Sequence, residues 1–154
     1  MSSIEGKSVK RVVTIIVIVA SILNISCSQK KTALYLSPMA AIEKSARSAP
    51  ATVNGVFEMT IKSTECKQGM EFLNSEVDNL DQRNLIVALR PNAVRELTDK
   101  FGVNPEHYFV GKRIQVNGEA KRTKEWVLYK NKNIRRYFYQ TKIFVRSADQ
   151  VTVL

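Results

Sequence analysis

The residues best suited to chemistry lie in one segment near the C-terminus, where cations and aromatic rings are interleaved. Residues 121–146 hold nine Lys or Arg and one acid, Glu125, a net charge of +8 in a chain whose formal net charge is +10. A cluster of one sign draws anionic partners, and rings among cations suit single-stranded nucleic acid, whose phosphates pair with cations while its bases stack. The candidate binding residues of this segment are Lys121, Arg122, Lys124, Trp126, Tyr129, Lys132, Arg135, Arg136 and Tyr137.

The same segment has a simpler interpretation. Trp126, Tyr129 and Tyr137 would then cover the surface of a β-sheet, with the lysine stems lying over them. A basic hairpin with aromatic edges would also suit an anionic membrane surface. The sequence leaves these interpretations open.

Signals of catalysis are weak. His107 is the single histidine, so no Ser/His/Asp or Cys/His constellation can be assembled without it. The acids Glu76, Asp78 and Asp81 lack the glycine and terminal glutamate of an EF-hand loop. With two cysteines and no CxxC, a structural zinc site is not expected. We therefore expect no enzyme activity, no metal and no cofactor.

The first residues have the pattern of a targeting signal. Lys7, Lys10 and Arg11 precede an apolar run over residues 12–23, which is typical of a secretory signal and too short to span a bilayer comfortably. A buried β-strand is the structural alternative. We expect an exported protein of the cell envelope, in the periplasm or anchored to a membrane.

The end of this run, Leu23-Asn24-Ile25-Ser26-Cys27, resembles the lipobox of bacterial lipoproteins, in which the cysteine is lipidated after cleavage. Ser26 and Ile25 fit the pattern, whereas Asn24 stands where that family prefers leucine. Lipidation of Cys27, cleavage near Ser26 or Ser28, and an uncleaved anchor all remain open. The expected organisation is a signal or anchor over 1–27, a linker over 28–51 with a short helix over 40–46, and one domain over 52–154.

Alternating apolar and polar residues predict the elements of that domain. Residues 76–83 read as a loop, Cys66–Gly69 as a turn, and Pro91 or Asn92 as the start of a helix that Gly102 ends. Gly111 would supply the positive φ of a tight turn, and Gly118 would permit sharp coiling of its strand. The predicted strands are 52–62, 70–75, 84–90 (lying centrally), 114–120 and 141–146, with an additional hairpin formed by 125–129, a turn at 130–133, and 134–139.

This order, with a helix after the third strand, is that of the OB fold, a mainly β, five-stranded Greek-key barrel. Phe72-Leu-Asn-Ser75, residues 84–89, Tyr108-Phe-Val-Gly-Lys112 and Ile114-Gln-Val-Asn-Gly118 resemble bacterial OB-type domains of exported proteins of uncharacterised role. The resemblance covers about Val53 to Leu154 and departs after Lys121, at the additional hairpin. It implies ligand binding on the second and third strands, to which Phe72 and Asn74 belong, and on the loop between the fourth and fifth.

Two functions follow as hypotheses. The first is a binding module that takes a polyanion, either single-stranded nucleic acid or an acidic glycan. The second is an envelope structural or interaction protein whose basic segment docks a protein partner or an anionic membrane surface.

Overall fold

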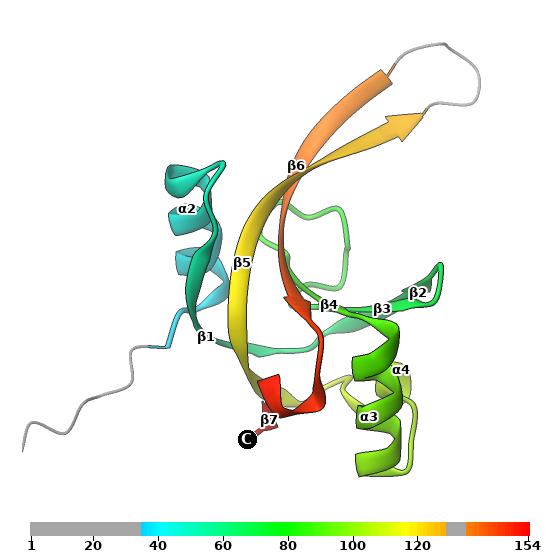
Figure 1. Ribbon diagram of the computed structural model, residues 1–154. Helices are drawn as coiled ribbons and strands as arrows, with labels where there is room; N and C mark the ends of the chain where they lie inside the picture. The colour runs from blue at the N-terminus through cyan, green and yellow to red at the C-terminus, as the bar shows by residue number, and fades with distance from the viewer. Residues whose placement is uncertain (1–34, 129–134) are drawn as a thin grey trace, which may run out of the picture. The chain divides into compact units, whose positions relative to one another are not determined.

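In a computed structural model, residues 35–128 and 135–154 are described, and they form one mainly β unit (Figure 1). Its strands belong to a single sheet with the hydrogen-bonded order β1-β5-β6-β4-β3-β2, and β7 pairs with β5. The strands are β1 (Val53–Thr60), β2 (Ser63–Lys67), β3 (Met70–Asn74), β4 (Leu85–Leu89), β5 (Arg113–Leu128), β6 (Arg135–Val145) and β7 (Val151–Val153). The helices are α2 (Pro38–Ser48), α3 (Pro91–Phe101), α4 (Pro105–Tyr108) and the 3-10 turn η1 (Ala148–Gln150).

The sheet turns back on itself between β1 and β2, which only Ile61 and Lys62 separate. The Ile61 amide donates to the Lys112 carbonyl at 2.9 Å, and the Lys62 amide donates to the Asn74 carbonyl at 2.8 Å. The chain therefore leaves its partner β5 and joins its partner β3 within two residues. β4 and β6 pair in parallel, whereas the other strand pairs are antiparallel.

The central position predicted for the third strand is confirmed. All five residues of β4 are buried, as expected for an uninterrupted apolar run inside a sheet. Around it lies the core, whose largest fully buried side chains are Phe57, Phe109, Ile61, Leu73, Leu85, Leu89, Leu97, Ile114 and Ile143.

The predicted helix and the positive φ expected at Gly111 are also present. α3 begins at Pro91, and Gly102 ends it with a φ of 70° while its amide donates to the Thr98 carbonyl at 2.8 Å. Gly111 has a φ of 80°. At Gly118 the strand passes close to the core, because a Cβ there would lie 3.1 Å from the Cγ2 atom of Ile143.

Within the segment expected to be a linker, α2 packs against β1, β5 and β6. The Ser37 side chain caps it by accepting from the Ala40 amide at 3.3 Å, and Pro38 stands at the first helical position. Ala41 and Ser45 are buried. Just before the helix, Leu36 bridges to Phe57 in parallel and so holds this segment against β1.

The prediction of a separate hairpin is wrong in one respect. Residues 113–128 form one strand, so the predicted strands 114–120 and 125–129 are continuous, and β6 likewise joins 135–139 to 141–145. No proline interrupts either stretch, and antiparallel pairing runs unbroken from Ala120–Ile143 to Leu128–Arg135. The turn predicted at 130–133 lies outside the described residues.

Two smaller differences concern loops. Residues 105–108, which lie between the predicted helix and the predicted strand 114–120, form α4, because the Asn104 side chain accepts from the Glu106 amide at 2.8 Å and Pro105 follows the cap. β2 extends through Cys66 to Lys67, and the turn is confined to Gln68 and Gly69. Within the part of the chain that the structure describes, no helix has the length and hydropathy needed to cross a membrane.

Candidate functional site

The basic segment lies where the β5–β6 ribbon extends beyond the core. Near the base of the ribbon, one face carries Ile114, Val116 and Ala120 of β5 and Ile143 of β6, all buried. Because side chains alternate along a strand, the same face continues outward to other residues of β5 and β6. These are Arg122, Lys124, Trp126, Tyr137 and Tyr139, which we call the ladder.

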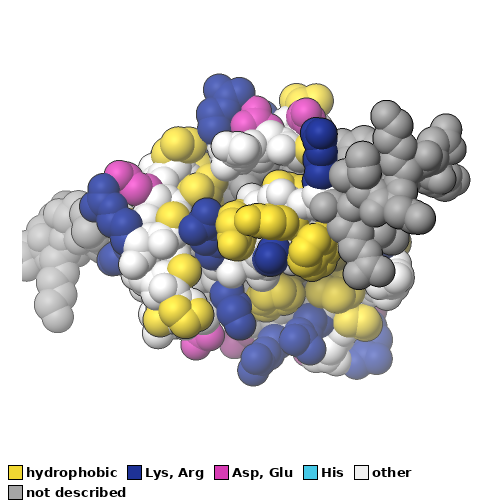
Figure 2. All heavy atoms as spheres, turned by 90° about the horizontal axis from the view of Figure 1, so that it is seen from above, with side chains coloured by type: hydrophobic (Ala, Val, Ile, Leu, Met, Phe, Trp, Pro, Cys, Tyr) yellow, Lys and Arg dark blue, Asp and Glu magenta, His cyan; other side chains and the backbone are white. Residues whose placement is uncertain are grey.

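The ladder rings are exposed because the core ends before them. The relative exposure of the side chains is 56% for Trp126, 54% for Tyr137 and 43% for Tyr139. Trp126 lies opposite Tyr137 in the β5–β6 register, and Lys124 lies opposite Tyr139. Seen along the ribbon, Lys and Arg side chains lie among hydrophobic ones on this side of the molecule (Figure 2).

The rings of the ladder contact one another edge to face. The ring centroids of Trp126 and Tyr137 are 5.5 Å apart at an interplanar angle of 66°, and those of Tyr137 and Tyr139 are 5.8 Å apart at 78°. These are the separations that aromatic pairs prefer. The result is a continuous row of three rings across two strands.

The cations of the ladder rest on these rings. The Nζ atom of Lys124 lies 3.9 Å from the Tyr137 centroid and 4.6 Å from the Trp126 centroid, and the Arg122 guanidinium lies 3.9 Å from the Tyr139 centroid. Such contacts contribute about 0.5–1 kcal/mol at exposed sites. Among the described carboxylates, none forms an ion pair with Arg122 or Lys124. The rings therefore hold these two positive charges in place without an ion pair to any carboxylate in the described part of the chain.

Hollows lie on both sides of the ladder. One, of about 320 Å³, lies between Ile42 and Ala46 of α2 and the ladder residues Arg122, Tyr137 and Tyr139. A second, of about 380 Å³, lies over β3, β4 and β6. Trp126 lines the second, together with Phe72, Asn74, Leu80 and Lys142.

Phe72 and Asn74, predicted as ligand contacts, differ in their surroundings. The half-buried Phe72 ring faces the Lys142 ammonium group, 5.8 Å from its centroid, and Lys142 also pairs with Glu125 at 2.6 Å. Asn74 is buried, and its side-chain oxygen accepts from the Asn84 amide group at 3.0 Å. The structure therefore gives Asn74 a role in holding Asn84.

The remaining predicted residues do not all join the ladder. Lys121 and Arg136 have the opposite parity on their strands, so they project from the other face of the ribbon. Arg135 is described by its backbone, which pairs with Leu128. Tyr129 and Lys132 lie outside the described residues.

The loop beside the second hollow is fixed by its own polar groups. The Asn84 side-chain oxygen accepts from the Glu76 amide at 3.2 Å, and its amide group donates to the Asn79 carbonyl at 3.3 Å. Hydrogen bonds from the side chain and backbone of Arg83 lower the pKa of Asp81 to about 2. Hydrogen bonds of the Asp81 and Asn84 side chains therefore fix the conformation of the loop.

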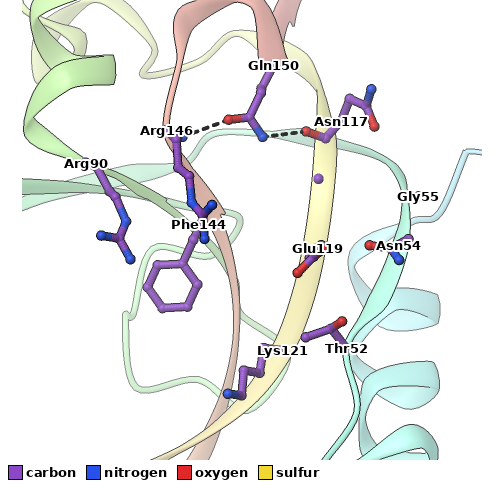
Figure 3. A pocket seen from close by; sticks show the side chains of 11 residues that line it. Thr52, Asn54, Gly55, Arg90, Asn117, Glu119, Lys121, Phe144, Arg146 and Gln150 are labelled. Carbon is purple, nitrogen blue, oxygen red and sulfur yellow. Dashed lines mark hydrogen bonds between the residues drawn. The ribbon is translucent and has the colours of Figure 1, made fainter.

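A groove that the sequence analysis did not predict lies on the opposite face of the ribbon (Figure 3). It has a volume of about 690 Å³, and Arg90, Lys121, Phe144 and Arg146 line it. The sequence signal for it was available, since Arg90 and Arg146 are each the last residue of a predicted strand. The sequence analysis did not predict that these two strands pair in parallel, which is what brings the two arginines together.

The groups considered for catalysis lie elsewhere. His107 is exposed in α4, and Cys66 is exposed in β2. The described residues contain no group of three or more His, Cys, Asp or Glu side chains that could hold a metal ion. A scan against protein-family models and searches of curated proteins and of solved structures gave no match to this chain.

Proposed function

We propose that this chain is a non-catalytic binding module of the OB type that holds a linear polyanion, in the first place single-stranded nucleic acid, along the ladder. The observation that carries the proposal is that the cationic groups of Lys124 and Arg122 lie over a row of three exposed rings that contact one another.

The topology supports the OB assignment. If β1 and β2 are counted as one strand bent at Ile61 and Lys62, five principal strands remain, and α3 follows the third of them. The parallel pair β4–β6 then joins the third and fifth strands, and β5 returns to β1, as in a partly open Greek-key barrel. β7 and α2 are additions to that plan.

The chemistry of the ladder supports a single strand of nucleic acid. Every base has a flat face, and a base stacked on an aromatic side chain gains about 1–3 kcal/mol. Trp126 presents the largest exposed ring, while Arg122 and Lys124 carry charges that phosphates can neutralise. Rings and cations on the same face let one strand use both kinds of contact at once.

The hollow over β3 and β4 meets the ladder at Trp126, whereas Phe138 and Lys142, which also line it, project from the opposite face of the β5–β6 ribbon. Trp126 belongs both to the ladder and to the lining of that hollow, and Phe72 lies within it. A strand that passes from Trp126 around the ribbon to that face would meet the Phe72 ring and the Lys142 ammonium group. This is the side on which OB folds hold their ligands.

A second candidate function is docking to an anionic membrane surface, in agreement with the export that the N-terminal segment predicts. The observation in its favour is the exposure of Val77 at 76% and Leu80 at 57%, in the loop beside the second hollow, which Leu80 and Trp126 both line. Exposed apolar and aromatic groups next to cations also suit a lipid headgroup layer.

The experiment uses Trp126, the only tryptophan of the chain, as its own reporter. The intrinsic fluorescence of the full chain is titrated with oligothymidylate, with polygalacturonate and with vesicles of anionic phospholipid. We expect the oligothymidylate to quench the fluorescence saturably, because a stacked base contacts the indole. Saturable binding of the polygalacturonate or the vesicles, without binding of the oligonucleotide, would reject nucleic acid and favour an acidic glycan or a membrane instead.

A further inference from the structure

We propose that the groove containing Arg90 and Arg146 is a second binding site, for an acidic sugar unit whose carboxylate meets the two arginines. This goes beyond the proposed function, because the groove lies on the opposite face of the β5–β6 ribbon from the ladder. Lys121 lines the groove, whereas its neighbour Arg122 belongs to the ladder.

Parallel pairing places the two arginines side by side. Leu89 of β4 lies opposite Val145 of β6, and the Arg90 amide donates to the Val145 carbonyl at 3.0 Å, so Arg90 and Arg146 follow on adjacent strands. Neighbouring strands are about 4.8 Å apart. Both side chains are exposed and run toward the Phe144 ring, with the Arg90 guanidinium 5.9 Å from its centroid (Figure 3).

The positive charges of this pair are not balanced by a carboxylate of the described residues. Among the described residues no carboxylate forms an ion pair with Arg90, Arg146 or Lys121. Like charges at neighbouring positions of a sheet repel each other and are destabilising. A carboxylate between the two guanidinium groups would relieve the repulsion and could accept paired hydrogen bonds from their planar donors.

The other wall of the groove is neutral and polar. Thr52, which directly precedes β1, Asn54 of β1 and Asn117 of β5 line it. Gln150 fixes its end, since its side-chain amide donates to the Asn117 carbonyl at 3.0 Å and its oxygen accepts from the Arg146 amide at 2.7 Å. A ligand that fits must be anionic at one end and carry uncharged hydrogen-bonding groups at the other.

The carboxylate of Glu119 favours an anion that carries hydroxyl groups over one that carries phosphate groups. It lies in the same groove, between the β1 wall and the arginines (Figure 3). A carboxylate repels phosphate groups and accepts hydrogen bonds from hydroxyl groups. A sugar ring supplies those hydroxyls, and its apolar face can lie against Phe144. A nucleoside monophosphate would place a charge of about −1.5 to −2 near Glu119, whereas one uronic acid unit carries a single negative charge. A uronic acid unit therefore fits the groove better than a nucleotide does, and a volume of about 690 Å³ leaves room for more than one ring.

The test is calorimetric titration of the full chain with trigalacturonate, with the neutral trisaccharide maltotriose, and with inorganic phosphate. We expect trigalacturonate to bind at least about tenfold more tightly than either of the others, a difference of about 1.4 kcal/mol. In the variant Arg90→Gln/Arg146→Gln, its affinity should fall by at least about tenfold. The control Arg95→Gln/Lys100→Gln loses the same charge from the exposed side of α3 and should bind as the original chain does.

Two further variants separate this site from its alternatives. Glu119→Gln should weaken trigalacturonate binding about threefold or more, because it removes a charged acceptor for hydroxyl groups. Trp126→Ala should leave it unchanged, even if nucleic-acid binding at the ladder is lost. The proposal is overturned if Glu119→Gln binds trigalacturonate as tightly or more tightly, if phosphate binds as well as the trisaccharide, if the α3 control loses as much affinity, or if trigalacturonate does not bind.

Discussion

The ammonium group of Lys124 lies 3.9 Å from the ring centroid of Tyr137, on the neighbouring strand of the same ribbon. The ammonium group of an exposed lysine can be hydrated or can lie on an aromatic ring. Here it lies on a ring that itself contacts Trp126 and Tyr139. The contact aligns a positive charge with a row of aromatic surfaces. The first two predictions test what this alignment does.

Removing the ladder cations should change the salt dependence of binding. In Arg122→Gln/Lys124→Gln, we expect weaker binding of oligothymidylate and a plot of log K against log salt whose slope is smaller by about 1.4, since each phosphate contact on a single strand contributes about 0.7. Fluorescence anisotropy of a labelled oligonucleotide over a salt series measures this slope. The control Arg95→Gln/Lys100→Gln has the same net charge and should keep the original slope. An equal reduction in both variants would show that only overall charge matters.

Removing the largest ladder ring should lower affinity at every salt concentration. Trp126→Ala should weaken oligothymidylate binding by about 1–3 kcal/mol, roughly 5- to 150-fold, because a stacked base loses its partner. Trp126→Phe, which keeps a ring, should recover most of the loss. Tyr35, another exposed ring, provides the comparison, since Tyr35→Ala should have no effect. Full affinity in Trp126→Ala would remove the ladder from the binding site.

The buried amide pair below the 76–83 loop should contribute to stability. Asn84→Ala leaves the Asn74 side-chain oxygen and the Glu76 amide without their partner, and we expect the free energy of unfolding to fall by about 1–3 kcal/mol. Urea denaturation followed by circular dichroism measures the change. Gln82→Ala, in the exposed part of the same loop, should cost little. Equal losses in the two variants would contradict the role assigned to Asn84.

Glu71 should make stability depend on pH. Its side chain is buried against α4, the Oε2 atom has no hydrogen-bond partner among the described groups, and burial raises the pKa of the carboxyl, although the Asn104 side chain and the Glu106 amide oppose the shift. The nearby Glu106 charge raises it further, and His107 lowers it. Below the ordinary pKa of 4.5, Glu71 is protonated in both the folded and the unfolded chain. Between that value and the raised pKa, the unfolded chain loses a proton that the folded chain keeps.

The free energy of unfolding should therefore fall as pH rises through this window and then level off. In Glu71→Gln this decline should disappear, because the amide does not titrate. Urea denaturation of both proteins from about pH 4 to pH 8 gives the difference curve, in which the other titrating groups cancel. A constant difference across that range would contradict a raised pKa for Glu71.

The N-terminal prediction concerns processing. We expect the chain produced in a bacterial host to be cleaved next to Cys27, so that intact-mass spectrometry finds a species well below the 17.4 kDa of the full chain. If Cys27 is lipidated, the mature chain should start at Cys27 and carry the mass of the acyl groups, and Cys27→Ala should abolish that increment. Recovery of the full-length mass alone would contradict cleavage.

Much of the fold could be predicted because its signals are local. Pro91 and Gly102 bound α3, and the uninterrupted apolar residues 85–89 within the predicted strand 84–90 indicated a central strand. The separation of 114–120 from 125–129 failed for the opposite reason. Nothing within those residues tells whether alternation continues in one strand or resumes in another, since this depends on the partner strand, and β6 pairs along the whole stretch.

The candidate site was predicted only in its composition. The structure brings Arg122, Lys124, Trp126 and Tyr137 together on one face. It places Lys121 and Arg136, which were included on sequence proximity, on the other face. Asn74 looked available for a ligand, yet it is buried by the loop that Asn84 holds.

The sequence alone determined the position of α3 and of most strands, and that cations and rings gather near the C-terminus, because these depend on neighbours along the chain. Only the tertiary structure decided which face of β5 and β6 packs against the core. It likewise decided where along the ribbon this packing ends, and therefore which rings remain exposed. It also decided that Arg90 and Arg146, far apart in sequence, stand side by side. The physical reason is that strand pairing and burial are set by long-range contacts, which a period of two along one strand cannot specify.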